Sequence, residues 1–456
     1  MIKVSPGTEP SAKLVKKIIK KFQMEELPRL QKLEQYYQVK NDILGRQLSS
    51  EKPNNRIAHG FAKYITNMAT GFFMGEGLRI DTEDTEYKKE LEEALGDHAN
   101  ETNFEVTKEM SKKGISFELL YMNEHSEIRS RYFKAEDFIP VYSTSVSEFL
   151  EFAIRVWQET DLLTGKTISC AAVYTRTEII TYRQKLDKKY EEVGRELHKF
   201  PDVPVMIYWN NEEVKGDYED VLTKIDAYDK AQSDTANDFE YFTNAYLVIA
   251  GAAGGLEKVG EYEDEEGRKA AKTLRQERIL FVDEKGQAQW LVKQVNDTAV
   301  ENFKNRIYDD IFFLSLVPAL TDESFAGNLT GVAIRYKLIG LEQLAAIKEY
   351  KFLPAYKKKL RLITKMINLK KNRNYDASTV KVYFDRNMTD NLKELAEIAA
   401  LLEGIISKET QLSLLPFIKD KQEELQRVLA DRLKKMDYDN LGNLDPDKVA
   451  NYVTGG

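Results

Sequence analysis

The sequence predicts an α+β protein built from several lobes. Apolar residues recur every three or four positions near the N-terminus and again beyond residue 218, which is typical of amphipathic helices. Between Gly114 and Trp209 they alternate instead, which indicates strands. The chain has 456 residues, more than one ordinary domain needs, and 42% of them are hydrophobic, which is enough for real cores.

Composition excludes several classes of protein. The net charge of -8 argues against a protein that binds nucleic acid through bulk electrostatics. The single cysteine, Cys170, excludes a disulfide framework and a cysteine-rich zinc site, and we expect it to be buried in a strand. The four histidines lack metal-ligand spacing, so no metal site is expected. No segment resembles a signal peptide or is long enough to cross a bilayer, so we expect a soluble, cytoplasmic-type chain without a membrane partner.

The N-terminal part is predicted to begin with helices and to continue as a sheet. Residues 11–48 indicate two helices broken near Pro28, and a third helix follows Ile57 and ends at the glycines 71–77. The predicted strands are Ser116–Leu119, Arg129–Phe133, Phe149–Trp157, Thr167–Tyr174, Glu178–Arg183 and Val205–Trp209. Turn signals such as Leu163–Lys166 join several of them, which favours an antiparallel meander.

Two helices of similar length are predicted to flank a small insert. Their apolar stripes are Val221, Ile225, Tyr228, Ala231, Phe239 and Phe242 in the first helix, and Val300, Phe303, Ile307, Ile311 and Leu314 in the second. Residues 244–297 predict a β-rich insert with strands in AYLVIAG and ERILFVDEKGQAQWLVK and a hairpin at Glu284–Gly286. The simplest arrangement is an antiparallel helix pair with this insert at its tip. The first helix is acidic and includes Asp226, Asp229, Asp234 and Asp238.

A loop and a long basic helix follow. Residues 321–334 contain glycine, serine and asparagine, which suit a flexible loop. The helix at 331–371 has eleven basic and two acidic residues, and Pro354 is expected to kink it. The basic residues nearest the loop are Arg335, Lys337, Lys348 and Lys351. The basic face is either solvated or an inter-subunit face paired with acids elsewhere, or it contacts DNA phosphate. A strand at Val380–Phe384 and a helical C-terminal region complete the chain.

No motif for catalysis or cofactor binding is apparent. The sequence has no Gly-x-x-x-x-Gly-Lys-Ser/Thr loop, and the glycines at 251–255 lack dinucleotide-binding spacing and predict a turn. Adjacent carboxylates such as Asp309 and Asp310 lie in charged helical runs, which indicates a solvated face. We therefore expect no catalytic, cofactor-binding or metal-binding residues.

Three long segments carry a resemblance to a known family. They are KPNNRIAHGFAKYITNMATGFFMGEG (Lys52–Gly77), NLTGVAIRYKLIGLEQLAAIKEYKF (Asn328–Phe352) and VKVYFDRNMTDNLKELAEIAALLEGIISKETQLSLLPFIKD (Val380–Asp420). They resemble the N-terminal signature, the tunnel loop with its following helix, and the C-terminal region of the portal, or head-to-tail connector, proteins of long-tailed bacteriophages of Gram-positive hosts. The resemblance covers about residues 20–435.

The resemblance implies a multi-lobed portal-type subunit that assembles into a ring, usually a dodecamer. Its parts would be an α+β wing at 1–217, stem helices at 218–243 and 298–320, a clip at 244–297, a tunnel loop at 321–334, a long kinked helix and wing strand at 335–387, and a helical crown at 388–456. The loop residues implied to face the DNA channel are Asp322, Glu323, Ser324, Phe325, Ala326, Gly327, Asn328, Leu329, Thr330 and Gly331. The acidic stem helix would repel phosphate, so that DNA slides rather than sticks.

The implied function is a non-enzymatic channel at the capsid vertex, through which the terminase packages double-stranded DNA and through which DNA later leaves. The implied partners are further copies of the chain, the terminase large subunit at the clip, a head-completion or adaptor protein, the scaffold and major capsid proteins, and the DNA. The implied location is the virion, with assembly in the host cytoplasm. Two alternatives stay open: a nuclease-like or helicase-like enzyme subunit, and a scaffold or adaptor that forms no ring.

Overall fold

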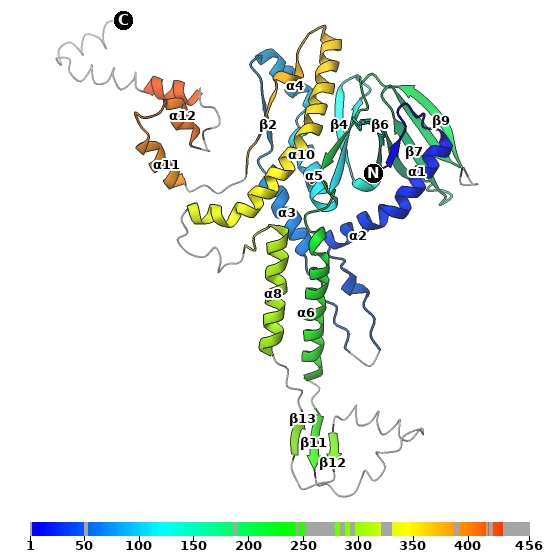
Figure 1. Ribbon diagram of the computed structural model, residues 1–456, viewed down its shortest axis with the longest axis vertical. Coiled ribbons are helices and arrows are strands. Elements are labelled where there is room, and N and C mark those ends of the chain that lie inside the picture. The colour runs from blue at the N-terminus through cyan, green and yellow to red at the C-terminus, as the bar shows by residue number, and fades with distance from the viewer. Residues whose placement is uncertain are drawn as a thin grey trace, which may run out of the picture. The chain divides into compact units, whose positions relative to one another are not determined.

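The computed structural model describes residues 2–49, 53–185, 189–242, 246–250, 279–282, 288–291, 297–320, 331–386, 392–415, 418 and 423–431. By their contacts the residues divide into two compact units. The first comprises Met1–Ala319 and Gly340–Asn387, and the second comprises Leu320–Ile339 and Met388–Gly456. The predicted α+β class is confirmed by the mixture of helices and sheets (Figure 1).

A six-stranded sheet is the largest layer of the first unit, with strand order β1-β5-β6-β7-β8-β9. The strands are β1 (Ile2–Val4), β5 (Phe138–Ser143), β6 (Leu150–Thr160), β7 (Thr167–Tyr174), β8 (Glu178–Gln184) and β9 (Tyr190–Leu197). Strands β5 to β9 pair antiparallel in chain order, which confirms the predicted meander, and β1 pairs with β5 in parallel. Strand β9 was not predicted because it is a charged, largely exposed edge strand without apolar alternation.

Helix α1 (Ala12–Glu25) covers one face of this sheet (Figure 1). Its residues Val15, Ile18 and Phe22 are buried in one cluster with Phe152 and Ile154 of β6. Ser11 caps the helix by accepting a hydrogen bond from the backbone N–H of Leu14. The helix therefore owes its position to an apolar stripe at helical spacing that meets an apolar strand face at twofold spacing.

A three-stranded sheet covers the opposite face, with order β10-β3-β4. Its strands are β3 (Ile115–Met122), β4 (Ile128–Phe133) and β10 (Val205–Trp209). Ala153 of β6, which lies between Phe152 and Ile154, is buried on this side with Phe117 and Val205. The two alternating faces of β6 thus enter two separate cores, as the period of a strand requires. Cys170 of β7 is buried, as expected.

The remaining elements of the first unit are mostly helices. They are α2 (Leu27–Tyr37), α3 (Phe61–Met74), α4 (Thr85–Leu95), α5 (Ala99–Lys113), α6 (Leu222–Phe242), α8 (Asp297–Ser315) and, from Gly340 onward, α10 (Gly331–Lys371). Pro28 lies in the first turn of α2, where its missing N–H costs nothing, so the predicted break is confirmed. Helix α10 continues through Pro354 and bends along its course (Figure 1). Strands β2 (Leu78–Asp81) and β14 (Lys381–Phe384) form an antiparallel pair.

A separate three-stranded sheet lies in the predicted insert. Its strands are β11 (Tyr246–Ala250), β12 (Ile279–Val282) and β13 (Ala288–Leu291). The strands were predicted, but the hairpin between β12 and β13 is wrong, because the order is β12-β11-β13. Strand β11 lies between them, parallel to β12 and antiparallel to β13. The apolar YLVIA sequence of β11 explains this, since a central strand is paired along both edges.

The second unit contains the first turns of α10 and the C-terminal helices. The latter are α11 (Leu392–Leu401), α12 (Lys408–Ser413) and a helix at residues 423–431. Ser407 caps α12 by accepting a hydrogen bond from the backbone N–H of Thr410. The helical character predicted for this region is confirmed for the residues described.

Candidate functional site

Helices α6 and α8 pack side by side as the predicted pair (Figure 1). The Lys224 ammonium lies 2.7 Å from the Asp310 carboxylate, and the rings of Tyr228 and Tyr308 have centroids 6.3 Å apart. From the first pair to the second, the residue number rises along α6 and falls along α8. The two helices are therefore antiparallel. The antiparallel arrangement predicted from the sequence is therefore confirmed.

An aromatic cluster joins the helix pair to α3. The Phe61 ring meets the rings of Tyr228, Tyr308 and Phe312 edge-on, with centroids 5.2 to 5.9 Å apart. The Tyr64 hydroxyl donates to the backbone carbonyl of Pro318, at 3.0 Å. Edge-to-face aromatic contacts contribute beyond their buried area. The cluster therefore fixes this end of the helix pair, which leads into the predicted tunnel loop, to the N-terminal lobe.

The predicted acidic residues of α6 do not form a free acidic face. Asp229 is fully buried and accepts from the side chain of Asn41 at 2.5 Å and from the backbone N–H and Nδ1 of His59 at 2.9 and 2.7 Å. The expectation that Asp229 lines a channel is therefore wrong, because its carboxylate is needed to satisfy buried donors of the segment after α2.

The other three acids differ in exposure. Asp226 accepts a hydrogen bond from the Tyr36 hydroxyl, and burial raises the pKa of its carboxyl against the lowering effect of that bond. Asp234 is half exposed and accepts from Arg46 at 2.6 Å. Asp238 is partly exposed and also has an interaction partner. The helix thus uses part of its acidic charge to hold residues 41–59 against itself.

Two predicted cations of α10 are bound within the subunit. The Lys348 ammonium is buried against the carboxylate of Asp217 at 2.7 Å and also hydrogen-bonds Asn210. Burial lowers the pKa of Lys348, and the charge of Asp217 opposes that change. Lys351 pairs with Glu212. Pairing with acids of the same subunit was not predicted. The burial of Lys348 contradicts both a solvated or inter-subunit position and a DNA contact for this residue.

A second buried pair lies three helical turns farther along α10. The Lys359 ammonium donates to the Glu118 carboxylate of β3 at 2.6 Å, and the Tyr208 hydroxyl of β10 donates to the same carboxylate at 2.7 Å. Both charged side chains are at most 1% exposed. Phe352, between the two pairs, packs on Tyr208 with ring centroids 4.6 Å apart. Helix α10 is therefore anchored to the three-stranded sheet by charge and by aromatic packing together.

Helix α10 approaches the end of α8 closely at Gly340. A Cβ added to Gly340 of α10 would lie 2.6 Å from the carbonyl oxygen of Leu316, at the end of α8, so only glycine allows this approach. Residues 321–330 of the loop lie outside the described residues, and Gly331 begins α10. Arg335 and Lys337 of α10 are exposed and have interaction partners.

The apolar stripes of the helix pair are only partly covered. Ile225, Ile307 and Ile311 are buried as predicted. Phe303 and Leu314, which were predicted to face inward with them, are 51% and 50% exposed. Other exposed apolar residues of this region are Phe239, Phe313 and Leu316. The stripe prediction is therefore wrong for Phe303 and Leu314, and also for Phe239, which was predicted in the stripe of the first helix and is 60% exposed.

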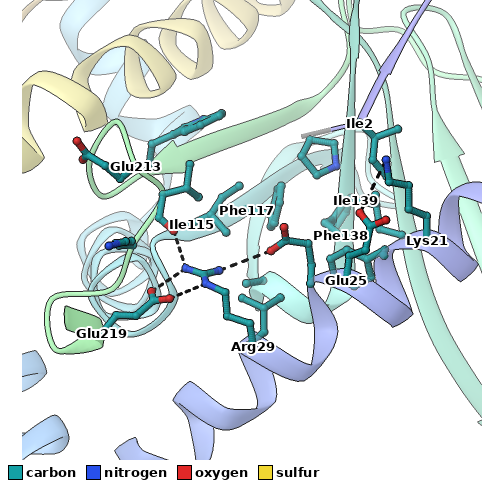
Figure 2. Close-up of a pocket in the computed structure, with 18 of the residues that line it drawn as sticks. Ile2, Lys21, Glu25, Arg29, Ile115, Phe117, Phe138, Ile139, Glu213 and Glu219 are labelled. Carbon is teal, nitrogen blue, oxygen red and sulfur yellow. Dashed lines mark hydrogen bonds and ion pairs between the residues drawn. The ribbon is translucent and has the colours of Figure 1, made fainter. Parts of the chain in front are cut away.

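A cavity of ≈ 470 Å³ lies between α1, α2 and the two sheets (Figure 2). At its edge the Arg29 guanidinium donates to both carboxylate oxygens of Glu219 at 2.7 Å and to the carbonyl of Val214 at 2.7 Å. Figure 2 shows Arg29 pointing at Glu219 rather than into open space. This bidentate pair ties α2 to the turn that starts α6. We assign it to positioning the helix pair.

The described residues contain no group of three or more His, Cys, Asp or Glu side chains that could hold a metal ion. Among the described helices, none combines the length and the apolar character needed to cross a membrane.

Comparison with known proteins identifies the family. Residues 16–436 match the family described as phage portal protein, SPP1 Gp6-like. The chain belongs to this family of phage portal proteins. The portal protein of Bacillus phage SPP1 is 24% identical over 447 residues, covering 92% of this chain and 86% of the relative. The portal protein of Clostridium phage phiCD119 is 24% identical over 442 residues, covering 89% and 94%. The portal resemblance seen in the sequence is thereby confirmed.

Solved structures were also compared with this portal subunit. The match to a chain in the neck of an empty GTA particle, computed with C6 symmetry, has a TM-score of 0.41 and 12% identity over 78% of this chain and 90% of that chain. The match to the neck of a native GTA particle, computed with C12 symmetry, has a TM-score of 0.38 and 10% identity over the same shares. Family membership makes the subunit a structural component of a phage particle.

Sequence reasoning missed the residues that hold the portal subunit's helices in place. Glu118, Asp217 and His59 were not singled out, although each partners a residue that was predicted. A signal existed for Glu118, because it is a charged residue within an apolar stretch of a strand. No comparable signal marks Asp217, which lies in a polar turn.

Proposed function

We propose that the chain is the subunit of a dodecameric ring that forms the DNA channel at one vertex of a tailed-phage capsid. The match to the portal family over residues 16–436 carries this proposal. In this role the subunit is structural and performs no chemistry, and it acts in the virion after assembly in the host cytoplasm. Terminase packages double-stranded DNA through the ring, and DNA leaves by the same route.

The uncovered apolar residues of α6 and α8 support assembly into a ring. Phe313 is 79% exposed and Phe239 is 60% exposed, on helices whose buried residues form a single small seam. In a closed ring each subunit contacts its two neighbours through different faces, so the next subunit can cover these side chains. We therefore place the stem, the helix pair α6 and α8, at a subunit interface.

The remaining parts take the roles implied by the family. Residues 321–334 act as the tunnel loop, and residues 244–297 act as the clip that docks the terminase large subunit and later a head-completion or adaptor protein. The wing and crown contact the scaffold and major capsid proteins. Among the stem acids, Asp226, Asp234 and Asp238 are proposed to repel DNA phosphate in the channel, because none of the three is fully buried. Arg335 and Lys337 contact DNA or a neighbouring subunit.

Ring formation is tested by negative-stain microscopy and native mass spectrometry of the purified full-length chain. The expected result is a closed ring with a central hole and twelve subunits. A stable monomer, or an open oligomer at every concentration, would overturn the proposal. The loop's role is tested by Gly327→Pro, since proline fixes φ and removes an N–H. Rings should form normally, while packaged DNA per procapsid, with terminase and ATP supplied, should fall sharply.

A further inference from the structure

A second cavity lies between α10 and the loops at one end of the sheets. Its volume is ≈ 310 Å³, and its charged lining consists of Arg176, Asp202, Lys358, Arg361 and Lys365. Three of these cations occupy one face of α10, because positions three and four apart are neighbours on a helix. The fourth, Arg176, comes from the turn between β7 and β8. Four cations and one carboxylate therefore surround a space large enough for a small anion.

The cations of this cavity are poorly neutralised by the subunit itself. The only ion pair among the described residues of the lining joins Arg176 to Asp202, at 3.9 Å, close to the limit for such a pair. Arg361 and Lys365 are exposed and make no ion pair or hydrogen bond to another described residue. On α10 this contrasts with Lys348 and Lys359, each of which has a buried carboxylate. Among the described residues, Arg361 and Lys365 therefore lack the charge complementarity that Lys348 and Lys359 have.

Two of the cations are held in fixed positions. The Arg176 guanidinium lies over the Phe149 ring, 4.4 Å from its centroid, which limits its movement. The Lys358 ammonium donates to the backbone carbonyl of Val205 at 3.1 Å. Burial and the charges of Arg361 and Arg176 together lower the pKa of Lys358 to about 8, against the opposing charge of Asp202. An ammonium held in this way beside other cations is stabilised by an added anion.

We propose that this cavity is a binding site for a phosphate group, and that in the phage particle the phosphate belongs to the backbone of double-stranded DNA. Two guanidinium groups and two ammonium groups can together donate to several oxygens of one phosphate and balance its charge. The phosphate site stands on the cavity alone, whereas DNA as its source rests on the proposed function.

The experiment measures binding of a short random-sequence DNA duplex to the full-length chain by fluorescence anisotropy over a series of salt concentrations. The test variant is Arg361→Gln/Lys365→Gln. The matched control is Lys17→Gln/Lys20→Gln, which removes the same charge from two exposed positions of α1, outside any cavity lined by α10. We expect about tenfold weaker duplex binding by the test variant, and a salt dependence whose slope is smaller by about 1, because one phosphate contact is lost. The control should bind as the wild type does.

Further arms separate the possible ligands. Inorganic phosphate should bind the wild type in calorimetric titration, and should compete with the duplex better than chloride at equal ionic strength. Phosphate binding that needs Arg361, with duplex binding unchanged, would overturn DNA as the source. Polyglutamate binding that needs Arg361, without phosphate or duplex binding, would overturn the phosphate site in favour of an acidic protein segment.

Equal duplex affinity and equal salt slope in wild type and test variant, with no phosphate binding, would overturn the whole inference. Both variants should fold, because the substituted side chains are exposed. Thermal unfolding of each variant checks this. Negative-stain images of the same samples keep the two proposals apart. Rings without phosphate binding refute the cavity site alone, whereas phosphate binding without rings refutes the proposed function alone.

Discussion

Helix α10 and the stem helices meet the same lobe in different ways. From Leu341 to Ile367, α10 buries apolar side chains and two complete ion pairs against sheets and helices of its own subunit. The stem helices bury a short seam that includes Ile225 and Ile311, and beyond it they expose large apolar side chains such as Phe313. The packing of α10 between Leu341 and Ile367 is completed within the subunit, whereas the stem helices leave large apolar side chains uncovered.

The difference indicates which parts of the subunit fold alone and which complete their packing on assembly. Two fully desolvated charges are tolerated in α10 only because each has a carboxylate within 2.7 Å. The described part of the stem is held by its seam, by the aromatic cluster around Phe61 and by the buried contacts of Asp229. We therefore expect substitutions in the α10 anchor to change subunit stability, and substitutions on the exposed stem to change assembly.

The largest expected effect is at the pair between Lys359 of α10 and Glu118. Glu118→Leu leaves the Lys359 ammonium buried without a carboxylate and removes the acceptor of the Tyr208 hydroxyl. The free energy of unfolding, measured by chemical denaturation, should fall by about 3–5 kcal/mol. The double variant Glu118→Leu/Lys359→Met should recover most of this loss, because no charge is then left unpaired.

An exposed pair provides the control for that measurement. Asp220→Ala removes the partner of Lys215, where both side chains are largely solvent-exposed. It should leave the denaturation midpoint unchanged. If Glu118→Leu also leaves the midpoint unchanged, α10 is not anchored by buried charge, and the contrast with the stem disappears.

A second prediction concerns the acid that joins the stem to residues 41–59. Asp229→Ala removes the acceptor for Asn41 and for the backbone N–H of His59, both of which are poorly solvated. The subunit should lose about 2–3 kcal/mol of unfolding free energy. Asp234→Ala, five residues farther along the same helix, removes a half-exposed partner of Arg46 and should cost less than about 1 kcal/mol. Equal losses of unfolding free energy in the two variants would show that no buried acid anchors α6.

Much of the fold was predictable because local periodicity determines it. The strands β6, β7 and β8 alternate, and the breaks at Pro28 and at the start of the insert are written in turn-forming and helix-breaking residues. The strands of the insert were predicted correctly, but their order was not. A hairpin signal indicates only that two strands are joined by a short connection, and it does not show that a third strand, β11, pairs with both of them instead. Edge strand β9 gave no signal because its residues face water.

The functional residues were less predictable, because their roles depend on partners distant in sequence. Asp229 and Lys348 look like ordinary surface charges in a helical run, and burial makes them structural. Their partners His59 and Asp217 are 170 and 131 residues away along the chain. Periodicity also misassigned Phe303, since an apolar stripe marks a face that needs cover and does not say which chain covers it.

The third prediction concerns how the stability of the subunit changes at acidic pH. Burial raises the pKa of Glu34 in α2, but hydrogen bonds and charge from Lys112 and Lys113 of α5 outweigh it and bring the pKa to about 2, below the usual 4.5. The depressed pKa means that the stabilisation is present above pH 4.5 and is lost as pH falls from 4.5 to 2. At neutral pH Glu34→Gln should therefore lower the unfolding free energy by about 2 kcal/mol.

The same series of measurements contains its own check. The difference between Glu34→Gln and the wild type should shrink steadily as the pH of the denaturation experiment is lowered toward 2, the pKa of the folded state. Glu25→Gln, in a loose and exposed pair with Lys21, should track the wild type at every pH. A pH-independent difference would mean that Glu34 acts by packing rather than through its charge.

The smallest effect on subunit stability is expected on the exposed stem. Phe313→Ser changes a side chain that is 79% exposed, so it should shift the free energy of unfolding by less than about 0.5 kcal/mol. Ring formation should nevertheless fall strongly, because the same side chain loses the apolar surface that a neighbouring subunit would cover. Leu369→Ser on α10 is the matched control, since Leu369 is 73% exposed but lies beyond the anchored part of its helix. Analytical ultracentrifugation should show rings for Leu369→Ser and mostly dissociated subunits for Phe313→Ser. The reverse pattern would place the subunit interface on α10 and not on the stem, and intact rings in both variants would mean that exposed Phe313 is not covered on assembly.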